Sequence, residues 1–346
     1  MKGNEALAEA AIAAGCRHFF GYPITPQTEL AAHMSKRMPK IGGTYLQAES
    51  EIAAVNMVIG ASAAGVRAMT SSSSPGISLK SEGFSYLAGS DLPALIVNVQ
   101  RAGPGLGGIQ PSQADYWQAT RASGHGDFKM LVFAPSTVQE MIDLVETAFD
   151  LGDKYRMPAM ILSDGLLGQM MEPVVMRDKK IEVPERPWAA SGHQGKREHN
   201  VVNSLYIDPP NLEAIVKARF EKYRKIQGTE QRSEEYLTED ADIVIVAYGA
   251  SARISRSAVD LARKEGIKAG LIRPITLWPY PDKAILGRMR SAKAFLCVEM
   301  SMGQMVDDVR LIVNGKRPVE FYGRTGGMIP TPAEVLSEIK RIRGGV

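Results

Sequence analysis

Short apolar runs alternate with longer amphipathic runs along most of this chain, and no other feature restricts its possible folds as strongly. Each apolar run has the length of a strand, and each amphipathic run has the length of a helix. In the first part of the chain we expect strands at 18–21, 44–47, 67–70, 94–99, 130–133 and 159–162. The helices expected between them are 3–14, 26–36, 51–64, 77–88, 112–122 and 138–154. This rhythm predicts a mostly parallel sheet with helices on both faces.

A second series of the same kind starts at residue 242 and ends with a helix at 332–342. The sequence between the two series is charged and contains several prolines, and a charged amphipathic helix is expected at 212–226. A length of 346 residues also favours about two domains. We therefore expect an α/β chain with a doubly wound parallel-sheet domain over 1–178, a linker with a helical arm over 179–238, and a smaller α/β domain over 239–346.

Composition and charge exclude several classes of protein. The net charge is only +3 and no basic run is interleaved with aromatic residues, so nucleic-acid binding is not expected. No apolar segment approaches the roughly 20 residues of a membrane span. The N-terminus also lacks a signal-peptide core, so we expect a cytoplasmic protein that does not bind membranes. Cys16 and Cys297 lie far apart in apolar contexts typical of reduced core residues, and two cysteines are too few for an iron–sulfur cluster.

Polar, turn-rich segments follow three of the expected strands, at 21–26, 71–76 and 100–108. Ligands bind at the carboxyl ends of the strands in sheets of this kind, so these loops predict a site there. The chain has no nucleoside-triphosphate loop and no Gly-x-Ser-x-Gly elbow. The Gly-rich segment 103–108 lacks the spacing of a dinucleotide loop, and Pro104 removes a backbone donor, which disfavours nicotinamide binding.

Segment 44–60 places carboxylates between an apolar strand, which we expect to be buried, and a helix with almost no polar face, which we expect to be buried on most sides. Glu51 is expected in the first turn of that helix, close to apolar side chains. The pattern alone leaves two interpretations open. Either Ser50 caps the helix and Glu51 only satisfies the positive end of the helix dipole, or Glu51 takes part in chemistry.

Four motifs of this chain occur in the order seen in the α subunits of 2-oxoacid:ferredoxin oxidoreductases. They are Gly-Tyr-Pro-Ile-Thr-Pro at 21–26, Gln-Ala-Glu-Ser-Glu at 47–51, Thr-Ser-Ser-Ser-Ser-Pro-Gly at 70–76 and Val-Asn-Val-Gln-Arg at 97–101. The chain resembles this family over essentially its whole length. The segments that look like its branched-chain (2-oxoisovalerate) members are 105–115, 124–127 and 165–173. Segment 272–279 resembles the transketolase C-terminal-type domain of the same subunit.

The resemblance implies an enzyme that uses thiamine diphosphate, with a pyrimidine-type binding domain followed by a transketolase C-terminal-like domain. In that superfamily a glutamate at a helix start hydrogen-bonds the pyrimidine ring of the cofactor. The same pattern has a glycine nine positions after that glutamate. Glu51 fits this pattern, because Gly60 follows it at that distance, whereas Glu49 does not fit it. A carboxyl group in a dry, apolar site holds a proton more tightly and can share it with the ring.

Further site residues follow from matching positions in the family. Thr25 and Arg101 match the positions that bind the substrate carboxylate, and the planar fork of arginine suits an anion with two oxygens. From the residues alone, Thr25 could instead cap the next helix, and Arg101 could form a surface salt bridge. The other residues expected to contact the cofactor are Tyr22, Pro23, Ile24 and Ser74. Weaker candidates for the pocket lining are Ser71 to Ser74, Asp115 and His125.

The resemblance also implies that this chain is inactive alone, because it lacks the Gly-Asp-Gly segment with a later Asn that binds the metal and the diphosphate. We expect a β subunit to bring Mg²⁺ and the diphosphate ligands, and partner chains, including separate γ and ferredoxin-like δ subunits, to carry [4Fe-4S] clusters. The expected reaction converts a branched-chain 2-oxoacid such as 2-oxoisovalerate (3-methyl-2-oxobutanoate), coenzyme A and oxidised ferredoxin to acyl-CoA, CO₂ and reduced ferredoxin. Two alternatives stay open: an α subunit specific for 2-oxoglutarate, which needs an additional cation, and a non-catalytic scaffold subunit.

Overall fold

The computed structural model describes residues 1–176 and 183–345, and it contains one sheet of seven strands and one of five. The first sheet has the order β10-β5-β6-β4-β3-β1-β2. Its parallel strands are β1 (His18–Gly21), β2 (Thr44–Gln47), β3 (Ala68–Ser72), β4 (Leu95–Gln100), β5 (Leu131–Phe133) and β6 (Ala159–Asp164). The seventh strand, β10 (Thr276–Trp278), comes from the later part of the chain and pairs antiparallel with β5.

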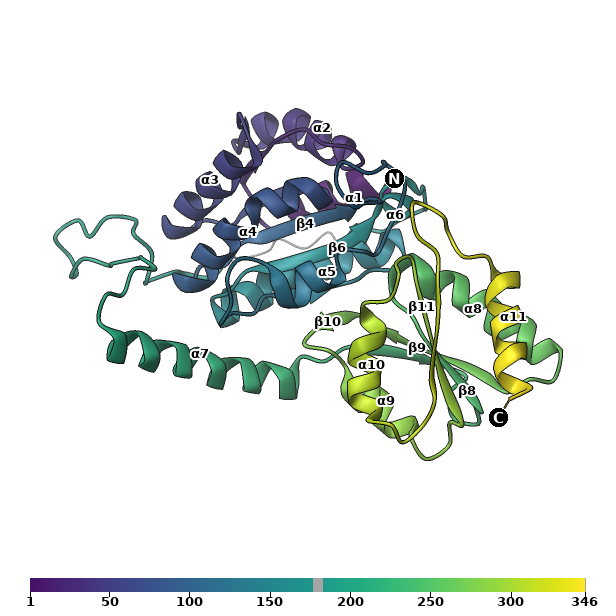
Figure 1. Ribbon diagram of the computed structural model, residues 1–346. Coiled ribbons are helices and arrows are strands. Elements are labelled where there is room, and N and C mark those ends of the chain that lie inside the picture. The colour runs from purple at the N-terminus through teal and green to yellow at the C-terminus, as the bar shows by residue number, and fades with distance from the viewer. Residues whose placement is uncertain (177–182, 346) are drawn as a thin grey trace.

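Helices cover both faces of the first sheet, as the right-handed connections between its parallel strands require (Figure 1). On one face lie α1 (Gly3–Ala13), α2 (Thr28–Arg37) and α5 (Val138–Tyr155), and α1 packs against the other two. On the other face α3 (Glu51–Ala63) packs against α4 (Ser74–Gly89). The short elements are a 3₁₀-helix (Met38–Ile41), a π-helix (Gln118–Ala122) and α6 (Gly165–Gln169).

The second sheet has the order β12-β11-β8-β9-β7. Its strands are β7 (Ser233–Tyr236), β8 (Ile243–Val246), β9 (Ala269–Pro274), β11 (Ala294–Glu299) and β12 (Val319–Gly323), and β7 is antiparallel to β9. Two pairs of helices lie on opposite sides of this sheet (Figure 1): α8 (Gly249–Lys264) with α11 (Pro332–Arg343), and α9 (Asp282–Arg288) with α10 (Met305–Val313). Helix α7 (Pro209–Thr229) leads from an irregular segment into this domain.

Local sequence explains where several of these helices begin. Ser50 accepts a hydrogen bond from the backbone N–H of Ala53 at the start of α3, and Thr137 accepts one from Glu140 at the start of α5. Hydroxyl caps of this kind satisfy backbone donors that have no partner within the helix. The strands β3, β4 and β6 are buried along their whole length, as expected for central strands of a parallel sheet.

The structure confirms the predicted α/β class, with mostly parallel sheets and helices on both faces. Cys16 and Cys297 are buried free thiols, and burial raises the pKa of Cys16 to about 12. The described part of the chain contains no helix that is both long and apolar enough to cross a bilayer.

Three expectations about local structure are wrong. Strand β2 is not buried, because it forms an exposed edge of the first sheet. Helix α3 is not buried on most sides either, since Ile52 is 48% exposed. The helix expected at 112–122 starts only at residue 116 and continues as the π-helix, because residues 112–115 are irregular and bond to the second domain.

The domain boundaries at 178 and 238 stay a prediction, and residues 177–182 lie outside the described part of the chain. Two strands are separated from the rest of their sheets by the predicted boundary at 238. Strand β7 precedes residue 239 but joins the second sheet, and β10 follows it but joins the first.

Candidate active site

The three polar loops predicted to form a site do meet at one edge of the first sheet. Strands β4, β3, β1 and β2 are neighbours in that order, and they are parallel. The carboxyl ends of β1, β3 and β4 lead into residues 22–27, Ser73 and residues 101–115, and the end of β2 leads toward α3. Four adjacent strand ends therefore bring distant parts of the sequence together.

Glu51 occupies the first turn of α3, where it is 6% exposed. A Cβ built on Gly76 would lie 2.5 Å from Glu51 Oε1, so the carboxyl group rests directly against the first turn of α4. The positive end of a helix dipole favours a carboxylate at such a position. The Ser50 cap and the buried carboxyl occur together, so capping the helix and placing Glu51 in the site are compatible roles.

Unpaired polar atoms lie on the neighbouring strands β3 and β4, and one of them, Ser72 Oγ, lies beside this carboxyl group. The hydroxyl oxygens of Thr70, Ser72 and Ser73 near the end of β3, and Asn98 Oδ1 on β4, are buried without a hydrogen-bond partner. Buried polar atoms are nearly always paired in proteins, so a cluster of them at strand ends is the expected signature of a polar ligand. The site fits the amino-substituted ring of thiamine diphosphate, because it offers a carboxyl group together with several small polar side chains.

Arg101 ties two loops of the site together. Its side chain is buried, Nη1 donates to the backbone carbonyl of Thr25 at 3.1 Å, and Nη2 donates to that of Leu106 at 3.0 Å. Its Nε–H is buried and has no partner. Arg101 therefore forms no surface salt bridge in this structure, and its unpaired Nε–H remains as a donor for an anion.

The loop at 21–26 lies against Arg101, with Thr25 and Pro23 exposed and Tyr22 and Ile24 half-buried. The side chain of Gln27 holds this loop, since it donates to the Tyr22 carbonyl at 3.3 Å and accepts from Ser71 Oγ at 2.6 Å. Gln27, not Thr25, is the N-cap residue of α2, and it makes no side-chain cap bond.

Ser74 connects the strand ends to Asp115. Its hydroxyl donates to Asp115 Oδ2 at 2.6 Å and accepts from the backbone N–H of Arg101 at 3.0 Å. Asn98 donates to the same carboxyl oxygen at 2.9 Å. Burial raises the pKa of Asp115 despite these two hydrogen bonds. His125 does not join this group, because it contacts Ser85 toward the other end of α4.

The loop after β4 also joins the two domains. The side chain of Gln113 donates to the Tyr248 carbonyl at 2.9 Å and accepts from Ser251 Oγ and the Met300 N–H at 2.7 and 3.0 Å. Asp164, at the end of β6, accepts from two backbone N–H groups of α6, and complete burial raises its pKa to about 6. The edge of the first sheet is therefore fixed against the carboxyl ends of the second.

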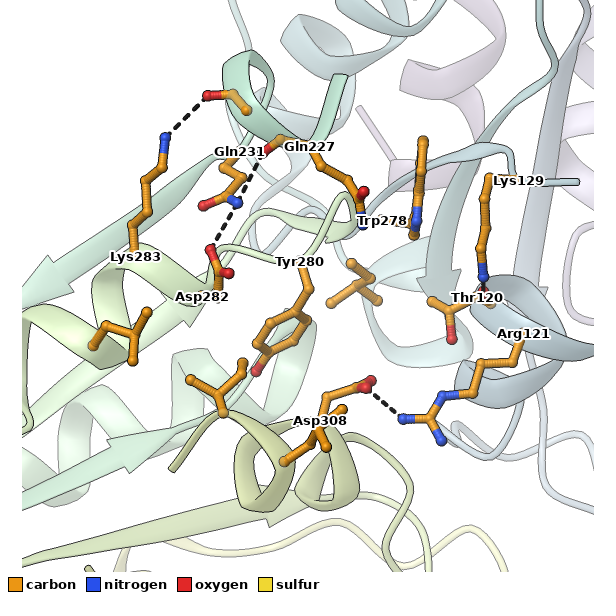
Figure 2. A pocket seen from close by; sticks show the side chains of 15 residues that line it. Thr120, Arg121, Lys129, Gln227, Gln231, Trp278, Tyr280, Asp282, Lys283 and Asp308 are labelled. Carbon is orange, nitrogen blue, oxygen red and sulfur yellow. Dashed lines mark hydrogen bonds and ion pairs between the residues drawn. The ribbon is translucent and has the colours of Figure 1, made fainter. Parts of the chain in front are cut away.

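A separate cavity of about 700 Å³ lies where the π-helix, the end of α7, β10, α9 and α10 meet (Figure 2). Most of its charged groups have a partner within the chain: Asp308 pairs with Arg121, Asp282 accepts from Gln231, and Lys283 donates to the Gly228 carbonyl. Glu51, Thr25 and Arg101 do not line this cavity. Among the described residues, no group of three or more His, Cys, Asp or Glu side chains is placed to hold a metal ion.

Several residues of the site were not predicted from the sequence. Lys80 lies in α4, fully buried, and its ammonium group donates to the backbone carbonyl of Glu51 at 3.2 Å. The sequence could have indicated Lys80, because it is a lysine among the apolar and small residues of a helix. Gln113 and Gly76 carry no such signal, since glutamine and glycine are common in loops and turns.

Two family models together match most of the chain. The model described as "Pyruvate flavodoxin/ferredoxin oxidoreductase, thiamine diP-bdg" matches residues 9–240, and "Pyruvate:ferredoxin oxidoreductase core domain II" matches residues 241–335. The ketoisovalerate oxidoreductase subunit VorB of Methanothermobacter thermautotrophicus is 49% identical over 99% of this chain and 97% of its own. The 2-oxoglutarate synthase subunit KorA of the same organism is 37% identical over 99% of this chain and 98% of its own.

Solved structures agree with these matches. A 2-oxoglutarate:ferredoxin oxidoreductase from Magnetococcus marinus, with 2-oxoglutarate, coenzyme A and succinyl-CoA bound, aligns with a TM-score of 0.86 and 30% identity. The alignment covers 99% of this chain and 64% of that one. A split-gene transketolase at 15% identity shares the fold, with a TM-score of 0.63 over 99% of this chain and 97% of that one. This chain therefore belongs to the family of 2-oxoacid:ferredoxin oxidoreductase subunits, and it contains the thiamine-diphosphate-binding module of that family.

Proposed function

We propose that this chain is the α-type subunit of an enzyme that oxidatively decarboxylates branched-chain 2-oxoacids, such as 2-oxoisovalerate, to acyl-CoA, CO₂ and reduced ferredoxin. The observation that carries this proposal is the buried Glu51 carboxyl group, which lies against Gly76 beside the unpaired hydroxyl group of Ser72. A scaffold subunit would gain nothing from a buried acid next to unsatisfied polar atoms, because both cost stability.

Glu51 has the central role in the proposed mechanism. When bound, thiamine diphosphate supplies the nucleophilic carbon and the electron sink that decarboxylation of a 2-oxoacid needs. Glu51 would hold the ring end of the cofactor and share a proton with a ring nitrogen, and the burial of its side chain would keep water away from that proton. The hydroxyl groups of Ser72 and Ser73, which lack partners within the chain, would be available to the polar edge of the same ring.

Arg101 and Thr25 orient the substrate in the same proposal. Arg101 Nε–H has no partner within the chain, so it is available to the carboxylate of a 2-oxoacid. The exposed side chain of Thr25 lies on the loop that Arg101 holds, and its hydroxyl serves as a second donor. The half-buried Tyr22 and Ile24 and the exposed Pro23 form the wall on the cofactor side of this loop, and Ser74 fixes the start of α4 beside it.

A branched-chain substrate is favoured over 2-oxoglutarate. A dicarboxylate needs a second cation, and the glycine-rich segment 103–110 next to Arg101 contains none. Identity is also higher to the ketoisovalerate subunit than to the 2-oxoglutarate subunit. Comparing kcat/KM of the assembled complex for 2-oxoisovalerate and 2-oxoglutarate tests this point, and a preference for the dicarboxylate would overturn it.

The proposal assigns the rest of the reaction to partner chains. A β subunit contributes Mg²⁺ and the ligands of the diphosphate, and γ and ferredoxin-like δ subunits complete the complex together with its [4Fe-4S] clusters. Coenzyme A is the co-substrate and ferredoxin the electron acceptor. This division is supported by relatives that are themselves named as subunits and by a related oxidoreductase structure with bound coenzyme A. We place the complex in the cytoplasm.

Replacement of Glu51 by glutamine in the assembled complex tests the catalytic role. Glutamine has nearly the same size but cannot exchange a proton, so turnover should fall by a factor on the order of 100 or more. Gel filtration should show the same complex for wild type and variant, which separates catalysis from assembly. Near-normal turnover of E51Q would reject the catalytic role of Glu51 and favour the scaffold alternative.

A further inference from the structure

Helices α3 and α4 approach each other along one face of α4, at residues 76, 80 and 83. A Cβ on Gly76 would lie 2.5 Å from Glu51 Oε1, and a Cβ on Gly83 would lie 2.5 Å from both Cγ atoms of Val55. Residues spaced by four and three positions share one face of a helix. The two glycines therefore let α4 lie close to α3 on either side of Lys80.

Lys80 is an unusual residue for this contact. It is 0% exposed, and its Nζ donates to the backbone carbonyl of Glu51 at 3.2 Å. Lysine is almost never fully buried without a charged partner, because its ammonium group loses the hydration it has in water. A leucine or methionine would fill the same space without that cost, so packing does not explain the lysine.

We propose that Lys80 is a positioning residue for Glu51. Lys80 anchors the first turn of α3 through the backbone carbonyl of Glu51, and its ammonium group serves as the buried counter-charge of the Glu51 carboxylate. This inference rests on the proposed function, in which Glu51 shares a proton with the cofactor. Lys80 fixes the backbone from which the Glu51 side chain extends, so it sets where the carboxyl group meets the cofactor.

The charges around α4 support this pairing. Burial lowers the pKa of Lys80 to about 8, and the Glu51 charge acts in the opposite direction. The other titratable groups near α4 are engaged elsewhere: Asp115 with Ser74 at its start, His125 with Ser85, and the exposed Glu82 with Tyr86. Lys80 is thus mostly protonated at neutral pH and loses its charge slightly above it.

Titration of the lysines in the full chain tests the charge pair without any turnover. In a chain labelled with ¹³C at lysine Cε, the NMR signal absent from the Lys80→Met variant identifies Lys80. Lys80 should titrate near pH 8 in wild type. In the Glu51→Gln variant the pKa of Lys80 should fall by roughly one pH unit, because the negative charge of Glu51 that raises it is gone while burial still lowers it. An unchanged pKa in E51Q would overturn the charge pair.

Turnover of the assembled complex tests the consequence for the reaction. Lys80→Gln keeps a donor for the Glu51 carbonyl without the charge, and Lys80→Arg keeps both. We expect K80Q and K80M to lose at least about tenfold in kcat and to lose an inflection near pH 8 in the pH profile. K80R should retain more activity than either and show no inflection. Wild-type kcat and pH profile in K80Q would show that the charge is not used and overturn the inference.

A double-variant cycle separates this inference from the proposed function. If Lys80 acts through Glu51, then K80M should add little to the loss already caused by E51Q. Losses that multiply would show that Lys80 acts independently, which overturns the inference while the role of Glu51 stands. Full turnover in E51Q would instead remove the proposed function itself. Lys264→Met, an exposed lysine in α8, is the matched control and should leave kcat and its pH profile unchanged.

Discussion

Replacement of Gly76 by alanine tests the position of the Glu51 carboxyl group without changing any ionisable residue. The added Cβ would lie 2.5 Å from Glu51 Oε1 and 2.1 Å from Ser72 Oγ. The carboxyl oxygen must therefore move by roughly half an ångström to reach even a very short contact, and by about 1 Å to reach an ordinary one. A misplacement of about 1 Å in a site of this kind costs about 100-fold in rate. We expect the assembled complex to lose turnover with 2-oxoisovalerate by about that factor.

The stability of the chain should change much less. Overpacking costs about 1–3 kcal/mol, and alanine in place of a helical glycine returns about 0.5–1 kcal/mol. The net loss of at most about 2.5 kcal/mol lowers Tm by a few degrees, which circular dichroism of the full chain measures. Gly287→Ala in α9 is the matched control, because nothing lies within 4 Å of its Cβ position. That control should keep full turnover and gain slightly in stability.

A second substitution distinguishes the two contacts. Ser72→Ala removes the nearer oxygen but leaves the contact between the new Cβ and Glu51. We therefore expect the double variant S72A/G76A to regain most of the lost stability while its turnover stays low. Turnover near the wild-type level in G76A would refute the reasoning, since it would mean that the observed position of the carboxyl group is not required. Full recovery of turnover in the double variant would refute it as well.

Arg101→Lys removes the fork that spans the Thr25 and Leu106 carbonyls, so KM for the 2-oxoacid should rise by roughly tenfold or more in steady-state kinetics. An unchanged KM would exclude Arg101 from substrate binding. The pKa of Asp164 is raised to about 6 from 3.8, so the folded chain binds this proton more tightly than the unfolded chain. Its contribution to the free energy of unfolding should therefore decrease by about 3 kcal/mol as the pH rises from about 4 to 6, and urea unfolding of Asp164→Asn should lack this decrease. Arg67→Met removes a buried cation from Asp150, which is half-exposed, and from Asp153, which keeps Arg186 as a partner, so it should cost about 1.5–3 kcal/mol in the same assay. A loss below about 1 kcal/mol would contradict the buried pair.

Local patterns in the sequence were sufficient for most of the fold. Strands β1 and β2 have the predicted bounds, strands β3 to β6 differ by one or two residues at one or both ends, and β10 was not predicted. These segments are short apolar runs between turn residues, which is the pattern of buried strands in a parallel sheet. The same patterns located Glu51 at a helix start, because Ser50 is a strong capping residue.

Long-range contacts account for the failures. Tyr45 and Leu46 made β2 look buried, but whether a strand lies at the centre or the edge of a sheet depends on strand order, which local apolarity does not encode. Strand β10 has three residues and pairs antiparallel with β5, more than 140 positions earlier in the chain. The segment around Gln113 has a helical pattern, yet its backbone and side chain bond to the second domain instead.

The contact between α3 and α4 shows how a site can depend on residues that carry no chemistry. Glu51 is buried because Gly76 and Gly83 allow the two helices to approach closely, and side chains at those positions would push them apart. Close approach in turn excludes water from Lys80, so its charge acts on Glu51 through a medium of low polarity. This contact therefore corresponds to a pattern that can be recognised in a sequence. The pattern is glycine, lysine and glycine at positions i, i+4 and i+7 of a helix that follows a strand. Where it lies opposite an acid at the start of the preceding helix, it predicts a buried pair of charges.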